Sequence, residues 1–148
     1  MPMIDVYARA GTFTDTQKLA EDIAAAVMRW EGVPAIPLFV DNTAAFVHEM
    51  PATAMSNVAG ANNFVRVQVL TPVGVLDRGK QIGVVRELTD IVAAAAGDPS
   101  LTDRTWVLIY ESPEGGWGLR GHASTGGDIA TAARAQLAEI AKKKNQSS

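Results

Sequence analysis

The sequence predicts an α+β fold built from two β-α-β units, with a four-stranded mixed sheet and two helices on one face. Two observations predict it. Each half of the chain reads strand, helix, strand, and the glycines and prolines that separate these segments recur in both halves at a nearly constant offset. A β-α-β crossover makes its two strands parallel, so two such units build one sheet. The chain has 148 residues, 47% of them hydrophobic, which is enough for one globular domain.

The first unit begins with a strand over residues 3–9. A helix follows, with Thr14 as the expected N-cap and Gln17 reaching back to complete a capping box. Gly32 ends this helix, as glycine commonly does, and a second strand fits residues 37–40. The first strand is indicated by apolar side chains that alternate with polar ones: Ile4, Val6, Ala8.

The second unit repeats this order. It begins with a strand over residues 64–70, continues with a helix that Asp77 caps and Gly97 ends, and closes with a strand over residues 106–110. The spacing predicts that one apolar stripe of the helix faces the sheet. The residues of that stripe are Ile82, Val85, Leu88 and Val92.

A last helix is expected over residues 128–143, with Ile129, Ala133, Leu137 and Ile140 as its apolar stripe. The strongest strands are apolar on both sides, so the sheet face opposite the two helices also needs a cover. One short alanine-rich helix is too small for that, and we therefore expect an oligomer that buries sheet faces between subunits. The predicted organisation is a single domain over residues 1–148, with units at about 2–61 and 62–124.

Composition excludes several classes of function. The net charge of -3, with mixed signs, gives no general attraction to nucleic acid or to an anionic membrane. There is no cysteine, and His48 and His122 have no partner at metal-ligand spacing, so neither a metal nor another cofactor is expected. No signal peptide and no apolar run of ~18 residues is evident, so the expected location is the cytoplasm.

Pro2 is the residue with the most distinctive chemistry. If Met1 is removed, Pro2 becomes a free secondary amine that the strand behind it holds in place. An α-amino group titrates near ~7.7–8.0, and burial or a nearby cation lowers that value towards neutrality, where a general base works best. If Met1 is retained, the nitrogen of Pro2 is an amide without basicity. Proline at position 2 is also common by chance.

Proline at position 2, the doubled β-α-β unit and the expected oligomer together resemble the tautomerase superfamily. The segments GDPSLT at 97–102 and ESPEGGWGLRG at 111–121 are similar to the second strand and closing hairpin of 4-oxalocrotonate tautomerase. The start of the chain, Pro2-Met3-Ile4, and the spacing from Gly11 through Asp15 to Gln17-Lys18 match the entry to the family's first helix. The doubled length resembles malonate semialdehyde decarboxylase and cis-3-chloroacrylic acid dehalogenase.

The resemblance implies a homotrimer and an enzyme of the tautomerase type, an isomerase without a cofactor. In it, Pro2 is the general base for keto-enol or double-bond proton transfer in a small keto or enol acid. An alternative within the same fold is a carbon-carbon or carbon-halide lyase, in which a cationic Pro2 assists decarboxylation or hydration. A second alternative is a trimeric binding protein without catalysis.

The resemblance also suggests substrate-binding residues, with departures from the family pattern. Trp117 falls where an aromatic residue of the closing hairpin packs over the active site, although it can equally be a packing residue. The loop over residues 71–76 lacks the arginines that family members acting on carboxylates carry there, so Val75 and its neighbours make the expected pocket more apolar. A substrate carboxylate then needs another cation. Arg120, in the hairpin, and Arg9, on the strand that Pro2 begins, are the preferred candidates, and the alternative for each is a solvated surface arginine.

Overall fold

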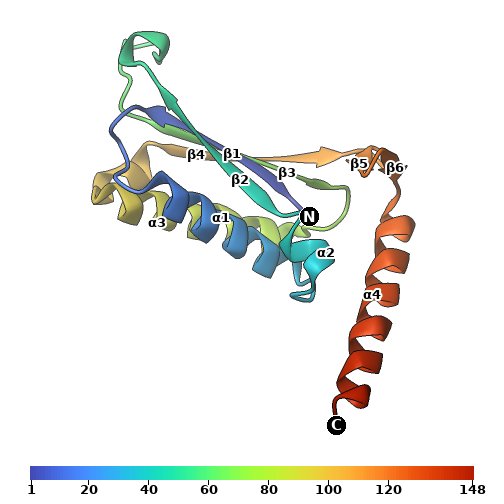
Figure 1. Cartoon of the computed structure of the whole chain (residues 1–148). Helices are drawn as coiled ribbons and strands as arrows, with labels where there is room; N and C mark the ends of the chain where they lie inside the picture. Colours follow the sequence, from blue (N-terminus) through green and yellow to red (C-terminus); the bar gives the residue numbers. More distant parts are fainter.

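A computed structural model of residues 1–148 shows a four-stranded sheet with two long helices packed across one face (Figure 1). The strand order is β2-β1-β3-β4, with β1 at Met3–Arg9, β2 at Ala44–Met50, β3 at Val65–Pro72 and β4 at Thr105–Ser112. β1 runs parallel to β2 and β3 parallel to β4, whereas the central strands β1 and β3 are antiparallel. The predicted α+β fold with a mixed sheet is therefore confirmed.

The helices that cover the sheet are α1 (Thr16–Glu31) and α3 (Arg78–Ala96). Each ends at a glycine in the left-handed conformation, Gly32 and Gly97, as predicted. α3 also begins at the predicted cap, because the carboxylate of Asp77 accepts a backbone hydrogen bond in the first turn. These residues predict helix ends well because each one provides hydrogen bonds for backbone groups that a helix end leaves unpaired.

The predicted N-cap of α1 is wrong by one residue. Asp15, not Thr14, is the cap, and its Oδ1 accepts a hydrogen bond from the backbone N–H of Lys18 at 2.9 Å. Gln17 does not reach back to the cap but donates to Glu21. A carboxylate caps a helix as well as a hydroxyl does and adds a favourable charge at the N-terminus, which favours Asp15 over its neighbour.

The strand predicted over residues 37–40 is also wrong. These residues form the short helix α2 (Pro37–Val40), and the second strand of the first unit is β2, which follows it. Proline suits the first turn of a helix because that turn needs no backbone N–H from it. The side chains of Asn42 and Thr43 then donate to carbonyl groups of α2 at 2.8 and 2.7 Å, which supports its end.

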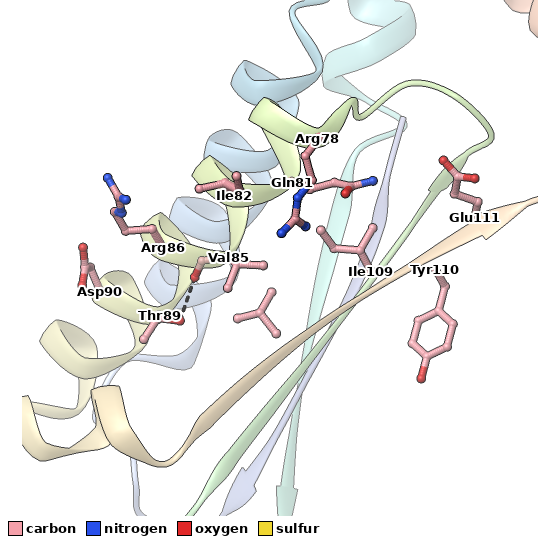
Figure 2. Close-up of a pocket in the computed structure, with 11 residues that line it drawn as sticks. Arg78, Gln81, Ile82, Val85, Arg86, Thr89, Asp90, Ile109, Tyr110 and Glu111 are labelled. Atoms are coloured by element: carbon pink, nitrogen blue, oxygen red, sulfur yellow. Dashed lines mark hydrogen bonds between the residues drawn. The ribbon is translucent and has the colours of Figure 1, made fainter.

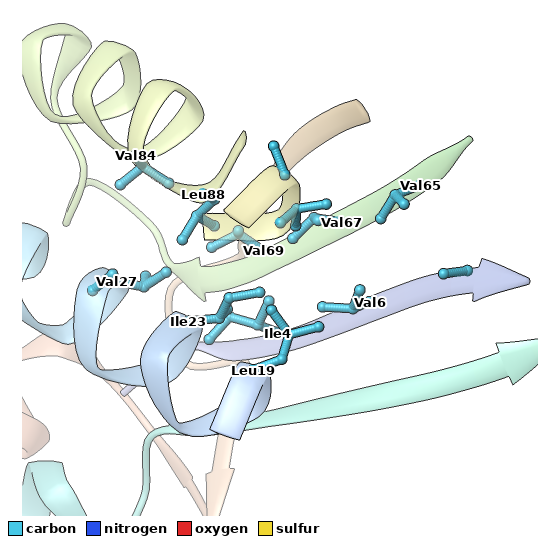
Figure 3. Close-up of a cluster of buried hydrophobic side chains, with 14 of the residues drawn as sticks. Ile4, Val6, Leu19, Ile23, Val27, Val65, Val67, Val69, Val84 and Leu88 are labelled. Carbon is cyan, nitrogen blue, oxygen red and sulfur yellow. The ribbon is translucent and has the colours of Figure 1, made fainter. Parts of the chain in front are cut away.

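The hydrophobic core lies between the sheet and the two helices (Figure 3). Side chains from β1, β3, α1 and α3 meet there, and Ile4, Ile23, Val67 and Leu88 are completely buried. The helices approach closely because α3 carries Gly83 where the indole of Trp30 in α1 lies. A Cβ atom at this glycine would come within 2.2 Å of the indole, so a larger residue would push the helices apart.

The predicted apolar stripe of α3 is only partly correct. Leu88 and Val92 are buried, and Val84 joins them, but Ile82 and Val85 are 47% and 39% exposed. These two side chains instead line a groove between α3 and the edge strand β4. Periodicity alone does not distinguish the two neighbouring faces of a helix that is apolar on both.

The chain ends with a small hairpin and a long helix that leave the main sheet. The hairpin consists of β5 (Trp117–Leu119) and β6 (His122–Ser124), and α4 (Gly126–Gln146) follows. α4 extends away from the sheet and packs near α2 (Figure 1). It therefore leaves uncovered the face that the sequence suggested it would help to cover. No helix in the structure combines the length and apolarity that crossing a membrane requires.

The sheet face opposite α1 and α3, called the open face below, carries a row of apolar and aromatic side chains. Trp106 and Leu108 of β4 are 46% and 39% exposed. A polar cluster lies among them, since His48 Nε2 is 2.6 Å from Asp5 Oδ1 and its ring stacks on Tyr7. The other large apolar side chains exposed on this face are Phe46, Leu70 and Tyr110.

Candidate active site at the chain start

Pro2 is buried and directly precedes β1. Its carbonyl oxygen accepts a hydrogen bond from the backbone N–H of Ala44 in β2 at 3.2 Å. Because β1 is flanked by β2 on one side and β3 on the other, two ladders of hydrogen bonds hold the strand that begins here. A chemical group at this position is therefore fixed by the sheet.

A buried carboxylate faces the chain start. Glu31 Oε2 lies 2.7 Å from the amino nitrogen of Met1, and the side chains of both residues are fully buried. Glu31 Oε1 accepts a hydrogen bond from the hydroxyl of Thr71 at 2.9 Å, and Thr71 is itself buried. The last turn of α1, the end of β3 and the start of β1 thus meet at one polar point inside an otherwise apolar environment.

A second cation lies near this point. Lys80, in the first turn of α3, donates a hydrogen bond from Nζ to the backbone carbonyl oxygen of Glu31 at 3.1 Å. It satisfies one of the carbonyl groups that the end of α1 leaves unpaired, and its charge complements the negative end of the helix dipole. The Glu31 carboxylate is therefore paired with the chain-start amine, whereas the ammonium of Lys80 contacts the backbone of the same residue.

Apolar side chains enclose the other side of Met1. The residue is 3% exposed and belongs to a packed cluster to which α2, β5 and α4 contribute. α4 is held against α2 by a hydrogen bond of 2.8 Å from the backbone N–H of Leu38 to Gln136 Oε1. The residues buried with Met1 in this cluster are Ile36, Leu38, Phe39, Trp117 and Ala133.

Trp117 lies where the hairpin meets the chain start. It is 8% exposed and belongs to the cluster that encloses Met1. It also lines a small surface hollow of about 210 Å³, together with Met3, Asn42 and Leu70. Trp117 therefore contributes both to the buried cluster around Met1 and to a hollow at the surface.

Val75 lies at the same end of the sheet. It is half-buried in the loop between β3 and α3, and this loop begins shortly after Thr71. The loop is tied to the end of β4, because Gly74 N–H donates to Glu111 Oε1 at 3.1 Å. The structure thus brings Pro2, Trp117 and the loop of Val75 to one end of the sheet.

The two arginines are not gathered there within one chain. Arg9 lies at the opposite end of β1 from Pro2, about 20 Å away along the strand, and donates to Asn62 Oδ1 at 3.0 Å. Arg120 is exposed at the tip of the hairpin, with a positive φ of 54°, and forms a two-residue turn with Gly121. It makes no hydrogen bond or ion pair within the chain.

Sequence reasoning missed Glu31, Thr71 and the walls that α2 and α4 provide. One signal for Glu31 was present. A carboxylate in the last turn of a helix opposes the helix dipole, so an acidic residue directly before a terminal glycine indicates a specific partner. The partners could not be identified from the sequence, because Met1 and Thr71 lie 30 and 40 residues away from Glu31.

The largest hollow in the structure lies elsewhere. It is a groove of about 800 Å³ between α3 and β4, at the free edge of the sheet (Figure 2). Figure 2 shows Ile82, Val85 and Ile109 lining it, with charged side chains around them. It includes none of Pro2, Trp117, Val75, Arg9 and Arg120. Nowhere in the structure do three histidine or acidic side chains converge as a metal site would need.

Solved structures share this fold. A fused 4-OT asymmetric trimer aligns with a TM-score of 0.67 at 19% identity, over 81% of this chain and 94% of that chain. Malonate semialdehyde decarboxylase, for which a structural basis of decarboxylase and hydratase activities is described, aligns with a TM-score of 0.63 at 19% identity, over 88% and 97% of the chains. A member of the cis-3-chloroacrylic acid dehalogenase family aligns with a TM-score of 0.63 at 16% identity, over 87% and 89%.

These similarities confirm that the chain has the fold of the tautomerase superfamily, as the resemblance implied. At these low identities they concern the fold alone. No protein-family model matches the sequence, and no curated protein matches it.

Proposed function

We propose that the protein is a tautomerase-type isomerase in which Pro2, after loss of Met1, is the general base for proton transfer in a small carbonyl acid. One observation carries the proposal. On a fold shared with tautomerase-superfamily enzymes, the first residues of the chain are buried where a carboxylate, a tryptophan and a loop from the second unit converge. Such convergence of titratable and apolar groups is typical of an active site.

The surroundings of Pro2 suit a base. A proline amine has no side-chain torsion that could misplace it, and the hydrogen bond from Ala44 holds the residue to the sheet. Burial favours the neutral form of an amine. Apolar walls also exclude bulk water, which strengthens electrostatic interactions with a substrate that becomes an enolate.

The space that Met1 fills is the proposed substrate pocket. It is enclosed by the cluster that contains Trp117 and by the Glu31 carboxylate. Removal of Met1 would free a volume the size of one methionine residue directly in front of Pro2. That volume suits a molecule of a few carbon atoms, and Trp117 lines both this space and the surface hollow beside it.

We further propose that the active protein is a homotrimer that buries the open face. The fused 4-OT structures to which this chain is similar are trimers. Within one chain Arg9 lies far from Pro2, and the tip of the hairpin that carries Arg120 is exposed. In this proposal, one of these arginines from a neighbouring copy holds the carboxylate of the substrate.

A second candidate function is decarboxylation or hydration with a protonated Pro2 as the acid. The observation that favours it is the buried Glu31 carboxylate, since a negative charge near an amine stabilises the ammonium form. Malonate semialdehyde decarboxylase, with its decarboxylase and hydratase activities, shares the fold.

The test is ketonisation of phenylenolpyruvate and 2-hydroxymuconate by the wild type and by Pro2→Ala. We expect the wild type to ketonise at least one of them and Pro2→Ala to lose at least ~100-fold in kcat/KM, as removal of a general base does. Intact mass must first show that Met1 is absent from both proteins. Equal activity in the variant, or no activity of the wild type with either compound, would contradict the proposal.

The protonation state of Pro2 separates the two candidates. An NMR titration of protein labelled with nitrogen isotope in proline gives the pKa of its amine directly. A value below the ordinary ~7.7–8.0 of an α-amino group supports the base and therefore the isomerase. A value above that range supports the acid and therefore the second candidate.

A further inference from the structure

We propose that Glu31 is a second acid-base residue of this site and that it also determines which substrates bind. Substrates that place a hydroxyl or carbonyl oxygen beside Glu31 are preferred over substrates that place a second carboxylate there. The inference rests on the proposed role of Pro2. It starts from the burial of Glu31: its side chain is fully enclosed, and its two oxygens contact only the chain-start amine and the hydroxyl of Thr71.

Loss of Met1 changes the environment of this carboxylate. The amine at 2.7 Å leaves with the residue, and the Thr71 hydroxyl stays as the hydrogen-bond partner of the carboxylate. The new amine of Pro2 then lies next to the vacated position. A carboxylate buried beside a titratable amine is an arrangement that proteins retain at sites where they do chemistry. The vacated position is then open to a polar group of a substrate.

The geometry places both Pro2 and Glu31 next to that position. The N–Cα, Cα–C and C–N bonds of Met1 connect its nitrogen to that of Pro2, so the two nitrogens lie within about 4 Å. Glu31 Oε2 lies 2.7 Å from the first of them. A small enol fits between the two groups, since two bonds separate its hydroxyl oxygen from the carbon that takes up a proton.

The proton balance of ketonisation follows from this arrangement. Glu31 accepts the proton of the enol hydroxyl, and the oxygen becomes a carbonyl. The electron pair of the carbon-carbon double bond takes a proton from the Pro2 ammonium, the conjugate acid of the base that acts in the reverse direction, and forms the new C–H bond. Pro2 is left neutral and Glu31 protonated, and exchange with water restores both. In the reverse direction Pro2 removes the proton from carbon while Glu31 protonates the carbonyl oxygen.

The same carboxylate disfavours one class of substrate. A second substrate carboxylate placed beside Glu31 would bring two like charges together in a buried space. The preferred substrate is therefore a small enol or carbonyl compound with at most one carboxylate. Its enol hydroxyl or carbonyl oxygen faces Glu31.

Glu31→Gln tests this inference, because the amide keeps an oxygen that accepts from Thr71 and removes the charge. Relative to wild type, kcat for phenylenolpyruvate should fall about 100-fold, and the limb of the pH profile that reports the second acid-base group should disappear. The kcat/KM ratio of 2-hydroxymuconate to phenylenolpyruvate should rise about tenfold as the repulsion is removed. Glu21→Gln, an exposed glutamate on the same helix, is the matched control and should change none of these values.

Two further measurements keep a structural role apart from a chemical one. The midpoint of thermal unfolding of Met1-free Glu31→Gln should equal or exceed that of wild type, whereas removal of a structural ion pair would lower it. Glu31→Asp should regain the lost pH limb. If Glu31→Gln does not fold, Thr71→Val removes the hydrogen bond that orients the carboxylate and should lower kcat.

The outcomes distinguish a failure of the proposed role of Glu31 from a failure of the proposed role of Pro2. The role of Glu31 is overturned, and that of Pro2 stays in place, if Pro2→Ala is inactive while Glu31→Gln keeps the kcat, the pH profile and the substrate ratio of wild type. If Glu31→Gln does not fold, an unchanged kcat in Thr71→Val together with an inactive Pro2→Ala leads to the same conclusion. Full activity of Pro2→Ala would instead overturn the proposed function.

Discussion

At the scale of single residues, two of the candidate residues occupy positions that are unfavourable for stability. Glu31 places a negative charge at the end of a helix that already carries a partial negative charge, and it is buried. Arg120 adopts a left-handed backbone conformation that costs a residue with a Cβ atom roughly 1–2 kcal/mol relative to its usual region. The two-residue turn of the hairpin accounts for the conformation of Arg120, whereas the proposed acid-base role accounts for the burial of Glu31.

Trp117 gives the prediction at this scale. Because its indole is almost completely buried in the cluster around Met1, Trp117→Ala should lower the free energy of unfolding by about 3 kcal/mol. It should also lower kcat/KM, since the wall that excludes water from Pro2 is lost. Urea unfolding and steady-state kinetics measure the two effects.

Trp117→Phe is the control for this prediction, because it keeps an aromatic wall and loses only part of the buried volume. Its kcat/KM should stay close to that of wild type. If Trp117→Ala loses stability but each folded molecule keeps full activity, the tryptophan is a packing residue and not part of the site.

At the scale of elements, α4 is attached to the rest of the protein by few groups, and its first turn is well defined. Thr125 and Asp128 form a reciprocal capping box there. The backbone N–H of Thr125, its hydroxyl and then His122 favour the charged carboxylate, so the pKa of Asp128 lies below its ordinary value of 3.8.

This lowered pKa predicts how the start of α4 responds to acid. Above pH 3.8, the ordinary pKa of the group, the charged form of Asp128 stabilises the helix. This stabilisation is lost as the pH falls from 3.8 through the lower pKa that Asp128 has in the folded protein. Backbone chemical shifts at the start of α4 should therefore move towards random-coil values in that range. In Asp128→Asn the same shifts should no longer change there, and an identical acid transition in both proteins would contradict the assignment.

At the scale of the whole molecule, the two faces of the sheet differ in what covers them. α1 and α3 bury one face, whereas the open face exposes Trp106, Leu108 and Tyr110 along β4. A face that exposes several large apolar side chains is typical of an interface. α4 points away from it, so none of the helices α1 to α4 covers the face (Figure 1).

The prediction at this scale concerns assembly. Leu108→Glu places a charge in the middle of β4 on the open face, and burying it between subunits without a partner would be unfavourable. We expect wild type to elute as a trimer and this variant as a monomer, measured by size-exclusion chromatography with light scattering. Val58→Glu, at a fully exposed apolar residue outside the sheet, should remain trimeric. A monomeric wild type would contradict the proposed homotrimer.

Much of the fold could be predicted because its signals are local. The alternation of Ile4, Val6 and Ala8 indicated β1, and Asp77, Gly32 and Gly97 marked helix ends, since each of these features depends on nearby backbone groups. β2 escaped prediction because its residues alternate weakly and its pairing with β1 defines it. The buried face of α3 could not be predicted for a similar reason, because packing against the sheet and α1 determines which of its apolar side chains are buried.

The same distinction applies to the site. The sequence by itself determined that Pro2 begins a strand and that Trp117 belongs to a closing hairpin, because both depend on local pattern and on resemblance. Only the tertiary structure decided that Glu31 and Thr71 meet at the chain start and that Arg9 lies at the far end of β1. Residues distant in sequence come together when helices pack on a sheet, and that packing follows from the burial of apolar side chains across the whole chain. No local segment encodes it.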